Sequence, residues 1–467
     1  MSIQIEKALL TTQIENVMTR LSVSFRICIC LFVVALNALV IFVIIPAVNK
    51  RIDPTYNVDQ FVDPYDQLAS NLISGNGYRL HADTAPTVSR EPGYPLFLAG
   101  IYSVFGTDFT AVKLANMFLA FGVAWLMTRI SGRISKNPVL VFGAPMLFLF
   151  HPGTLIAESR GGVEMLFTFC LMLFLFIACI ALETGRWTDY LISGAALGLA
   201  VLVKSTPLLF PLFLLVYLVI FKRNISKAGI SRNVAMMICG MLVVLSPWII
   251  RNYILTEKVI LTASVMGISA HAGLYDNTHL SSGSDWARID TDGARERRRL
   301  ALQLGLPFKD IKNAYYQDFY YTSDELEFSN VLLKSVMSEY ERRPTLFIRN
   351  VCFNFFNLWF RGKTWKSTGM NLLVQLPYLI LAVIGMALCV KNGEVKVSGL
   401  SALLLLYMVV VYVQILAQAR YSVPLIPIVS FFACITLVSI RGMLRATSEG
   451  EPEAFAVVMA SPSDTYR

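Results

Sequence analysis

The sequence predicts an all-α, polytopic membrane protein with about ten transmembrane helices, and three observations lead to this prediction. Of its 467 residues, 55% are apolar and only 15% are charged, whereas soluble domains carry about 25% charged residues. Several apolar runs approach the roughly 20 residues that a helix needs to span a bilayer. The basic residues behind the net charge of +9 flank these runs in short clusters, as residues that set membrane topology do. No binding to nucleic acid is therefore expected.

The N-terminal segment and the cysteines add two further expectations. The first 26 residues are too long and too acidic for the start of a signal peptide, so the apolar run at about 27–48 is expected to remain as the first span. All eight cysteines lie in apolar segments, and the two long polar loops contain none. They are therefore interpreted as small buried hydrophobic residues rather than as disulfides or metal ligands.

The clusters of basic residues indicate on which side of the membrane each span begins and ends. Arg20 and Arg26 precede the first span, so residues 1–26 are placed in the cytoplasm and the loop at 49–107 outside. The membrane domain then covers 27–440, with a second external segment at 254–366 and a polar cytoplasmic tail at 441–467. The further spans are expected at about 108–129, 138–156 and 162–182, in a hairpin around Lys204-Ser-Thr-Pro207, and at about 234–253, 368–390, 397–418 and 421–440.

Two apolar stretches are predicted to lie on the membrane surface. Residues 92–105 are too short to span. Residues 345–360 are equally short and carry Arg349 and three asparagines, groups that are costly inside a bilayer. We therefore expect an outer-surface or re-entrant helix at 345–360, although charge counting alone leaves a spanning helix open.

The first long loop contains a third short helix. Apolar residues recur there with the spacing of one helical face: Tyr65, Leu68, Ala69, Leu72 and Ile73. Asp63 is expected to cap this helix, Pro64 to begin it, and Gly75 or Gly77 to end it. Two carboxylates, Asp63 and Asp66, would then lie at the membrane surface.

Four motifs occur in order along the chain. They are Asp63-Pro-Tyr-Asp66 with Arg90-Glu-Pro-Gly-Tyr-Pro95, Leu202-Val-Lys-Ser-Thr-Pro207, Pro247-Trp-Ile-Ile-Arg-Asn252, and Arg420-Tyr-Ser-Val-Pro424. Together with the topology, they resemble the GT-C glycosyltransferases over residues 28–440. The most similar branch contains the dolichyl-phosphate-mannose protein mannosyltransferases and the bacterial aminoarabinose lipid A transferase.

This resemblance implies a GT-C-like bundle and a membrane-integral, mannosyltransferase-like enzyme. Such an enzyme moves a sugar, with inversion, from a polyprenyl-phosphate carrier to a glycolipid, lipopolysaccharide or protein acceptor at the outer face of the cytoplasmic membrane. A carboxylate of the first loop assists the transfer. Family members often have adjacent acidic residues, whereas here Pro64 and Tyr65 separate Asp63 from Asp66. Both aspartates are therefore catalytic candidates, and Asp59 is a third.

The chemistry of the reaction points to further residues. An attacking hydroxyl needs a general base, and the phosphate leaving group needs cationic charge. The candidates for binding donor phosphate are Arg90, Arg251, Arg420 and Lys204, and those for lining the site are Glu91, Tyr94, Glu158 and Tyr421. A divalent cation bridging Asp63 and the lipid phosphate would be chemically reasonable, although no cofactor is required.

Other interpretations stay open at this point. Asp63 and Asp66 can serve only to cap a helix, and Arg251 and Arg420 can be interface anchors. The alternative function is a polytopic transporter or a flippase for lipid-linked sugars, which would place binding groups at the bilayer midplane on broken helices. A non-catalytic scaffold subunit is a third interpretation.

Overall fold

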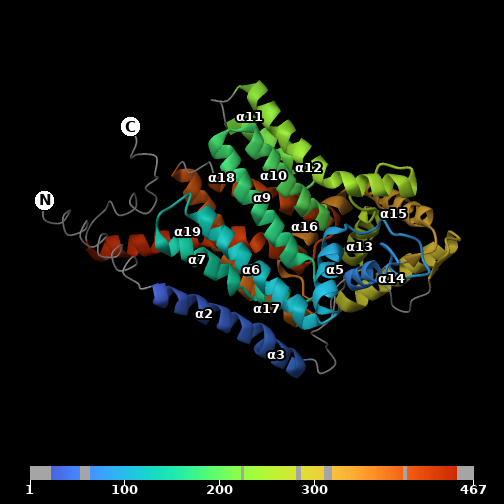
Figure 1. Ribbon diagram of the computed structural model, residues 1–467, viewed down its shortest axis with the longest axis horizontal. Coiled ribbons are helices and arrows are strands. Elements are labelled where there is room, and N and C mark those ends of the chain that lie inside the picture. Colours follow the sequence, from blue (N-terminus) through green and yellow to red (C-terminus); the bar gives the residue numbers. More distant parts are fainter. Residues whose placement is uncertain are drawn as a thin grey trace. The chain divides into compact units, whose positions relative to one another are not determined.

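The computed structural model describes residues 23–52, 64–221, 226–279, 286–309, 318–362, 364–392 and 397–449 (Figure 1). Within these ranges the chain is almost entirely helical, which confirms the predicted all-α membrane class. The chain divides into two compact units, Met1–Val58 and Asp59–Arg467, which are described separately.

The first unit contains one long apolar helical stretch. α2 (Val23–Leu39), the π-helical turn η1 (Val40–Ile44) and α3 (Ile45–Ile52) follow one another directly. The stretch Cys30–Arg51 is long and apolar enough to cross a membrane. It occupies the position of the predicted first span.

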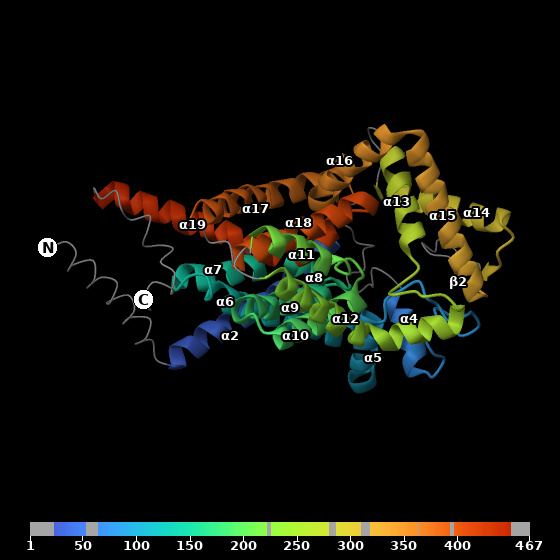
Figure 2. The same ribbon diagram turned by 90° about the horizontal axis from the view of Figure 1, so that it is seen from above.

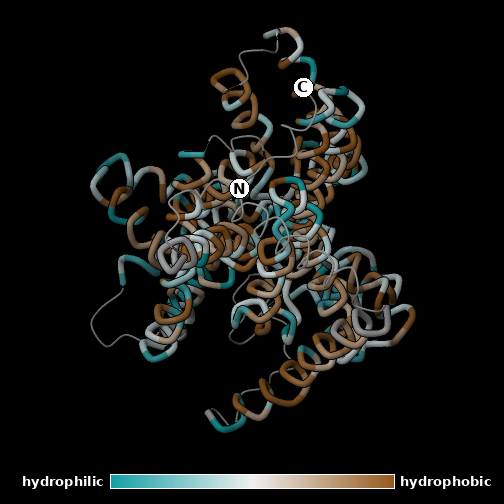
Figure 3. Tube along the Cα trace, turned by 90° about the vertical axis from the view of Figure 1, so that its left-hand side faces the viewer, coloured by the Kyte–Doolittle hydropathy of each residue, from teal (hydrophilic) through white to brown (hydrophobic). Residues whose placement is uncertain are grey.

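The second unit contains the other membrane helices. Together with the first unit, seven described helices are long and apolar enough to cross a membrane (Figure 3). Those of the second unit are α6 (Phe109–Ser131), α9 (Glu164–Thr184), α12 (Lys227–Thr256), α17 (Trp365–Lys391), α18 (Val397–Ile415), and η2 (Ala419–Leu425) joined to α19 (Ile426–Glu449). α7 (Pro138–Leu149) and α8 (Pro152–Glu158) meet at an angle of 57° and can form one broken span.

Two of the predicted spans are shorter than expected. α10 (Trp187–Val203) and α11 (Phe210–Phe221) occupy the fifth and sixth predicted positions but have 17 and 12 residues. The described residues therefore contain up to eight full-length candidate spans, and α10 and α11 account for the remainder of the predicted ten.

α10 and α12 pack with their backbones nearly in contact. A Cβ atom at Gly194 would overlap the carbonyl oxygen of Met237, and one at Gly240 would overlap that of Leu191. Small residues permit such close approach between membrane helices, where packing and not the exclusion of water drives association. The two helices therefore form a tightly packed pair.

The two helices predicted in the first loop are confirmed as α4 (Tyr65–Ile73) and α5 (Gly93–Phe105). α4 begins one residue later than expected, because Pro64 occupies the cap position before the first helical residue. Positive φ values at Gly75 and Gly77, 78° and 81°, explain why the helix ends there, since glycine adopts this conformation without steric cost. Asp63 lies outside the described residues.

The second polar segment folds into a small region of its own, which we call the α13–α15 region (described residues of 264–342). It contains α13 (Met266–Thr278), α14 (Trp286–Gln303), the antiparallel strands β1 (Phe308–Lys309) and β2 (Asp318–Phe319), and α15 (Thr322–Arg342). A separate apolar cluster holds these elements together: Ile268, Ala301, Leu306, Phe319, Phe328 and Leu332. The region lies at one end of the bundle (Figure 2).

α16 (Pro344–Phe360) occupies the predicted surface or re-entrant helix at 345–360, and its contacts explain why that helix contains polar residues. Asn354 and Asn357 are buried and exchange hydrogen bonds of 3.0 Å with Asn277 of α13. Asn354 also donates to the carbonyl oxygen of Val413 in α18, at 3.0 Å. The amides therefore face neighbouring helices and meet hydrogen-bonding partners there, which removes most of the cost of burying them.

His271 on α13 should make stability depend on pH. Burial, followed by the charges of Arg297 and His279, lowers the pKa of His271 from 6.5 to about 4. The unfolded chain then binds the proton more tightly than the folded protein. The contribution of neutral His271 to the stability of the fold is therefore fully present above about pH 6.5. It is lost as the pH falls from 6.5 toward 4.

We expect His271→Asn to lose less thermal stability between pH 7 and pH 5 than the wild type, as measured by melting temperature. The exposed His279, changed to Asn in the same way, serves as the control and should resemble the wild type. An equal loss in His271→Asn and in the wild type would show that this histidine is not the cause.

Candidate functional site

α4 and α5 pack as a hairpin that places Asp66 beside two tyrosines. The rings of Tyr65 and Tyr94 meet edge to face at 5.2 Å between centroids, and Tyr65, Leu68 and Ala69 are buried. The hydroxyl of Tyr102, on α5, donates a 2.7 Å hydrogen bond to Oδ1 of Asp66. Asp66 therefore has a tertiary partner, which the cap-completing role suggested by the sequence did not include.

The motif Arg90–Pro95 is shaped by its contact with the end of α10. A Cβ atom at Gly93 would lie 2.8 Å from the carbonyl oxygen of Leu202, so only glycine allows this approach. Oε1 of Glu91 accepts a hydrogen bond from the backbone N–H of Ser205, at 3.0 Å. Glu91 is only 6% exposed. The first-loop motif and the Lys204-Ser-Thr-Pro207 turn are thus joined directly.

Tyr94 lies fully buried between acidic groups. Burial, and next the proximity of Glu164, Tyr102 and Asp66, raise the pKa of its hydroxyl well above the ordinary value. Within the described part of the chain this hydroxyl has no hydrogen-bond partner. A buried hydroxyl with unused hydrogen-bonding capacity is costly unless something binds it.

Cationic side chains of two segments gather near the start of α9. Nη1 of Arg420 lies 3.7 Å from Oε1 of Glu164, whose side chain is 6% exposed. Lys204 Nζ lies 3.6 Å from the ring centroid of Tyr421 and 5.0 Å from that of Tyr412. The two tyrosine rings are stacked on each other at 5.5 Å. This arrangement holds cations over aromatic faces next to a buried carboxylate.

A second cluster surrounds Tyr78. The Tyr78 hydroxyl donates to the carbonyl oxygens of Arg90 and Glu91, at 3.3 Å and 2.9 Å. Arg251 stacks on Trp248, with its guanidinium carbon 4.5 Å from the ring centroid, and donates to the carbonyl oxygen of Thr87 at 2.8 Å. Burial raises the pKa of Tyr78, next the charge of Glu91 raises it further, and Arg251 and Arg90 oppose the rise. Arg251 therefore anchors the first loop.

Glu158 lies at the end of α8 and is fully buried. The side-chain amide of Asn116, on α6, donates to the carbonyl oxygens of Glu158 and Arg160, at 3.4 Å and 2.9 Å. These contacts fix the turn that leads into α9 and so help to place Glu164.

The structure thus brings most of the predicted residues to one end of the bundle. Asp66 and Tyr94 lie near Glu164, Arg420 pairs with Glu164, Lys204 lies on Tyr421, and Glu91 joins the turn beside Lys204. Arg90 and Arg251 gather around Tyr78 instead. Asp63 and Asp59 lie outside the described residues. The site predicted from sequence omitted Tyr102, Tyr78 and Tyr412, whose roles depend on contacts that no local spacing indicates.

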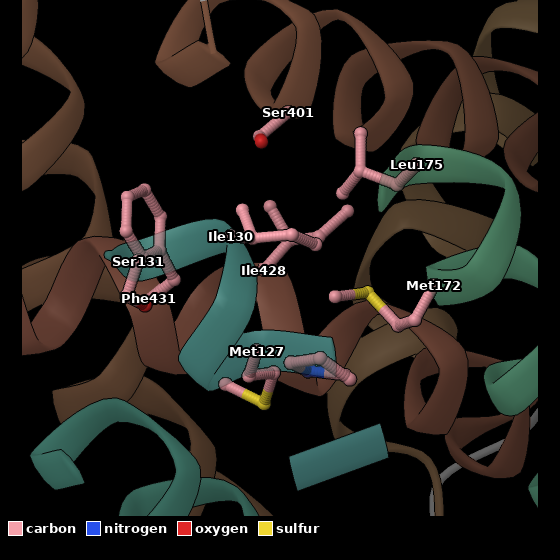
Figure 4. A pocket seen from close by; sticks show the side chains of 9 residues that line it. Met127, Ile130, Ser131, Met172, Leu175, Ser401, Ile428 and Phe431 are labelled. Atoms are coloured by element: carbon pink, nitrogen blue, oxygen red, sulfur yellow. The ribbon is translucent and has the colours of Figure 1, made fainter. Parts of the chain in front are cut away.

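A cavity elsewhere in the bundle does not belong to this site (Figure 4). Its lining is mostly apolar and includes Met127, Ile130, Met172 and Phe431. Asn116 and Ile130 both lie on α6, and 14 residues of helix span about 21 Å. The cavity is therefore remote from the charged cluster. No group of three histidine, cysteine, aspartate or glutamate side chains is arranged to hold a metal ion within the described ranges.

A polytopic helical bundle with acidic and cationic side chains gathered at one end, together with these motifs, is similar to the GT-C class of membrane glycosyltransferases. Residues 87–250 match the family model described as dolichyl-phosphate-mannose-protein mannosyltransferase. This segment contains the Arg90–Pro95 and Lys204–Pro207 motifs, and the match confirms the family that the motifs indicate. Residues 87–250 are therefore similar to the membrane glycosyltransferases of this family.

Two solved structures are also similar to the chain. They are crystal structures of ArnT from Cupriavidus metallidurans, one bound to undecaprenyl phosphate and one in the apo state. Both share 13% sequence identity with the chain. The matches cover 93% and 92% of this chain and 85% of each ArnT chain, with TM-scores of 0.39 and 0.34. No curated protein matches the chain by sequence.

Proposed function

We propose that the protein transfers a sugar from a polyprenyl-phosphate carrier to a glycolipid, lipopolysaccharide or protein acceptor, with inversion at the anomeric carbon. The observation that carries this proposal is the meeting of first-loop carboxylate and tyrosine side chains with a cationic cluster. Asp66, Tyr102 and Tyr94 come from α4 and α5, and Arg420 comes from η2. Acid, hydroxyl and cation are the groups that such a transfer requires.

The cations have a defined task in this reaction. Cleavage of the glycosyl–phosphate bond leaves negative charge on the phosphate, and nearby fixed cations stabilise it in a site that excludes water. Arg420 is suited to this role because its side chain is 24% exposed and lies 3.7 Å from Glu164, while its Nε donates a 3.0 Å hydrogen bond to Oε1 of Gln418. Lys204 lies close to Arg420, because both cations contact the ring of Tyr421. Arg90 and Arg251 would act from the Tyr78 side.

A first-loop aspartate would accept the proton of the attacking hydroxyl. Asp63 remains the first candidate because Asp66 already accepts a hydrogen bond from Tyr102, which leaves it less available as a base. Glu91, Tyr94, Glu158 and Tyr421 line or support the site. A divalent cation held by Asp63 would be compatible with the same chemistry, and the protein groups alone supply the acid–base and cationic functions.

The outer face of the cytoplasmic membrane is the proposed location of the reaction. α6 begins near the site, where Asn116 contacts the α8–α9 turn, and its last turn carries Arg129 at the opposite end of the helix. Arg133, Lys136 and Arg186 follow at the ends of α6 and α9. Basic residues mark the cytoplasmic ends of spans, so the charged cluster would lie on the other side.

The alternative function is transport or flipping of a lipid-linked sugar. That function would require binding groups near the bilayer midplane, whereas the charged groups described here gather at helix ends and in connecting turns. The placement of Glu164 in the first turn of α9 is an example.

Transfer by the purified protein in detergent tests the proposal. An enzyme makes product without two compartments, so incubation with undecaprenyl-phosphate-linked sugars and a set of acceptors should yield a glycosylated acceptor that mass spectrometry detects. A flippase would yield none under these conditions. Mass spectrometry of lipopolysaccharide and envelope glycans from a strain that lacks the gene would then identify the sugar and the acceptor. Unchanged glycans, together with no product in detergent, would refute the enzyme assignment.

A further inference from the structure

The α13–α15 region is attached to the first loop along a continuous line of hydrogen bonds, which we call the 84–88 seam (residues 84–88 and their partners). Every residue from 84 to 88 takes part. The bonds are Thr84 Oγ1 to Asp318 Oδ2 (3.0 Å), Ala85 N to Phe319 O (3.4 Å), Thr322 Oγ1 to Pro86 O (2.8 Å), Thr87 Oγ1 to Glu325 Oε2 (2.7 Å), Val88 N to Glu325 Oε1 (3.1 Å), and Ser264 N to Val88 O (2.9 Å).

Glu325 is the centre of this seam. Its carboxylate accepts three hydrogen bonds, from Thr87, from the backbone of Val88, and from the hydroxyl of Ser264 at 3.0 Å. The residue is 7% exposed. Burial raises its pKa, while these hydrogen bonds and the nearby charge of Arg90 oppose the rise. A buried carboxylate is retained without great cost only when such partners surround it.

The seam ends where the candidate site begins. Arg90 and Glu91 follow Val88 after a single residue, Ser89. Arg90 is 5% exposed and close to Glu325, while Glu91 reaches the backbone of Ser205. The path of the chain at residues 84–88 therefore determines where Arg90 and Glu91 lie.

We propose that Glu325 is a positioning residue: through Thr87, Val88 and Ser264 it holds the seam closed, and thereby fixes Arg90 and Glu91 for binding the lipid-phosphate donor. This inference rests on the proposed function for its consequence and on the hydrogen bonds of the seam for its geometry. It assigns to the α13–α15 region a part in donor binding, since Glu325 contacts the chain next to Arg90 and Glu91.

Alanine and glutamine at residue 325 have different expected effects. Alanine removes both acceptor oxygens and leaves the Val88 N–H and two hydroxyls without their partner, in a buried place where lost hydrogen bonds are expensive. Glutamine keeps one carbonyl oxygen for Val88 and Ser264. Its amide can donate to Thr87 Oγ1, whose own hydroxyl then turns to Ser89 Oγ, 2.8 Å away. Glu327, exposed on the same helix, offers a matched control.

The test measures the seam and the donor separately in Glu325→Ala, Glu325→Gln and Glu327→Ala. Hydrogen exchange of the peptide covering residues 84–92 reports on the seam, and titration with undecaprenyl phosphate reports on donor binding. We expect Glu325→Ala to exchange faster at 84–88 and to bind the lipid at least about tenfold more weakly, the effect of one or two lost hydrogen bonds. The lipid affinity of Glu325→Gln should lie within about threefold of the wild-type value, and that of Glu327→Ala should equal the wild-type value.

Kinetic constants distinguish a positioning role of Glu325 in donor binding from a general loss of structure. Glu325→Ala should raise the KM for the donor more than it lowers kcat. Lipid affinity in Glu325→Ala equal to that of the wild type would overturn the proposal, and so would unchanged exchange at 84–88. If Glu325→Ala does not fold, Thr87→Val and Ser264→Ala, which each remove one of the three bonds, must show smaller shifts in the same direction. A wild-type protein that neither binds the lipid nor transfers sugar would instead refute the proposed function.

Discussion

Asp63→Asn is expected to slow sugar transfer at least about a hundredfold, the lower end of what a general base contributes. Asparagine has nearly the same size as aspartate and keeps a hydrogen-bond acceptor, but it carries no negative charge to accept a proton or hold a cation. The protein should therefore be made, inserted and able to bind the donor lipid. Initial rates with purified protein in detergent, together with the affinity for undecaprenyl phosphate, measure the two steps separately.

Asp66→Asn is the matched comparison, because it makes the same chemical change three residues away. The Tyr102 hydroxyl can still donate to the remaining oxygen, so we expect an intact α4–α5 hairpin and a rate within about tenfold of the wild type. If Asp66→Asn abolishes transfer while Asp63→Asn does not, the base is Asp66. Near-normal rates in both variants would exclude a catalytic carboxylate on this helix.

Asp276→Ala is expected to destabilise the fold by about 3–5 kcal/mol, the usual result of removing one partner from a buried ion pair. Oδ2 of Asp276 accepts a 2.9 Å hydrogen bond from Nη1 of Arg361, and the side chains are 3% and 4% exposed. The pair joins α13 to the residue that follows α16. Its loss would leave the Arg361 guanidinium buried without its carboxylate.

The melting temperature of the purified protein, and its fluorescence-detected elution profile after heating, measure this effect. Arg343→Ala is the control, since Arg343 pairs with Glu339 at the surface with its side chain 70% exposed. Exposed pairs contribute only about 0–1 kcal/mol, so its melting temperature should barely change. Equal melting temperatures for Asp276→Ala and the wild type would show that this pair does not hold α13 in place.

The helices were predictable from sequence because their signals are local. The apolar face of α4 and the glycines that end it lie within 13 residues, Tyr65 to Gly77. The start of α4 was placed one residue early because Pro64 fits both the cap and the first helical position. α10 and α11 proved shorter than full spans, since apolar composition alone does not fix where a helix breaks.

The site was only partly predictable, for a different physical reason. Arg420 and Lys204 were recognisable as cations at the ends of spans, and in the structure Arg420 lies near Glu164 and Lys204 lies on Tyr421. Glu325 was not singled out, because it is one of many acidic residues in a long polar segment. Its partners Thr87 and Val88 are more than 230 positions away, and no spacing in the sequence indicates such a contact.

The close packing of α10 against α12 has a consequence for Arg90. Arg251 extends from α12 to the carbonyl oxygen of Thr87, and the backbone of Ser205, just beyond α10, binds Glu91. One attachment point thus lies on α12 and the other just beyond the end of α10, two helices whose backbones touch at Gly194 and Gly240, and Arg90 lies between the two attached residues in the chain. The distance bridged by residues 87–91 is therefore set inside the bundle, so this short segment should keep its length even when a bulky lipid enters or leaves beside it.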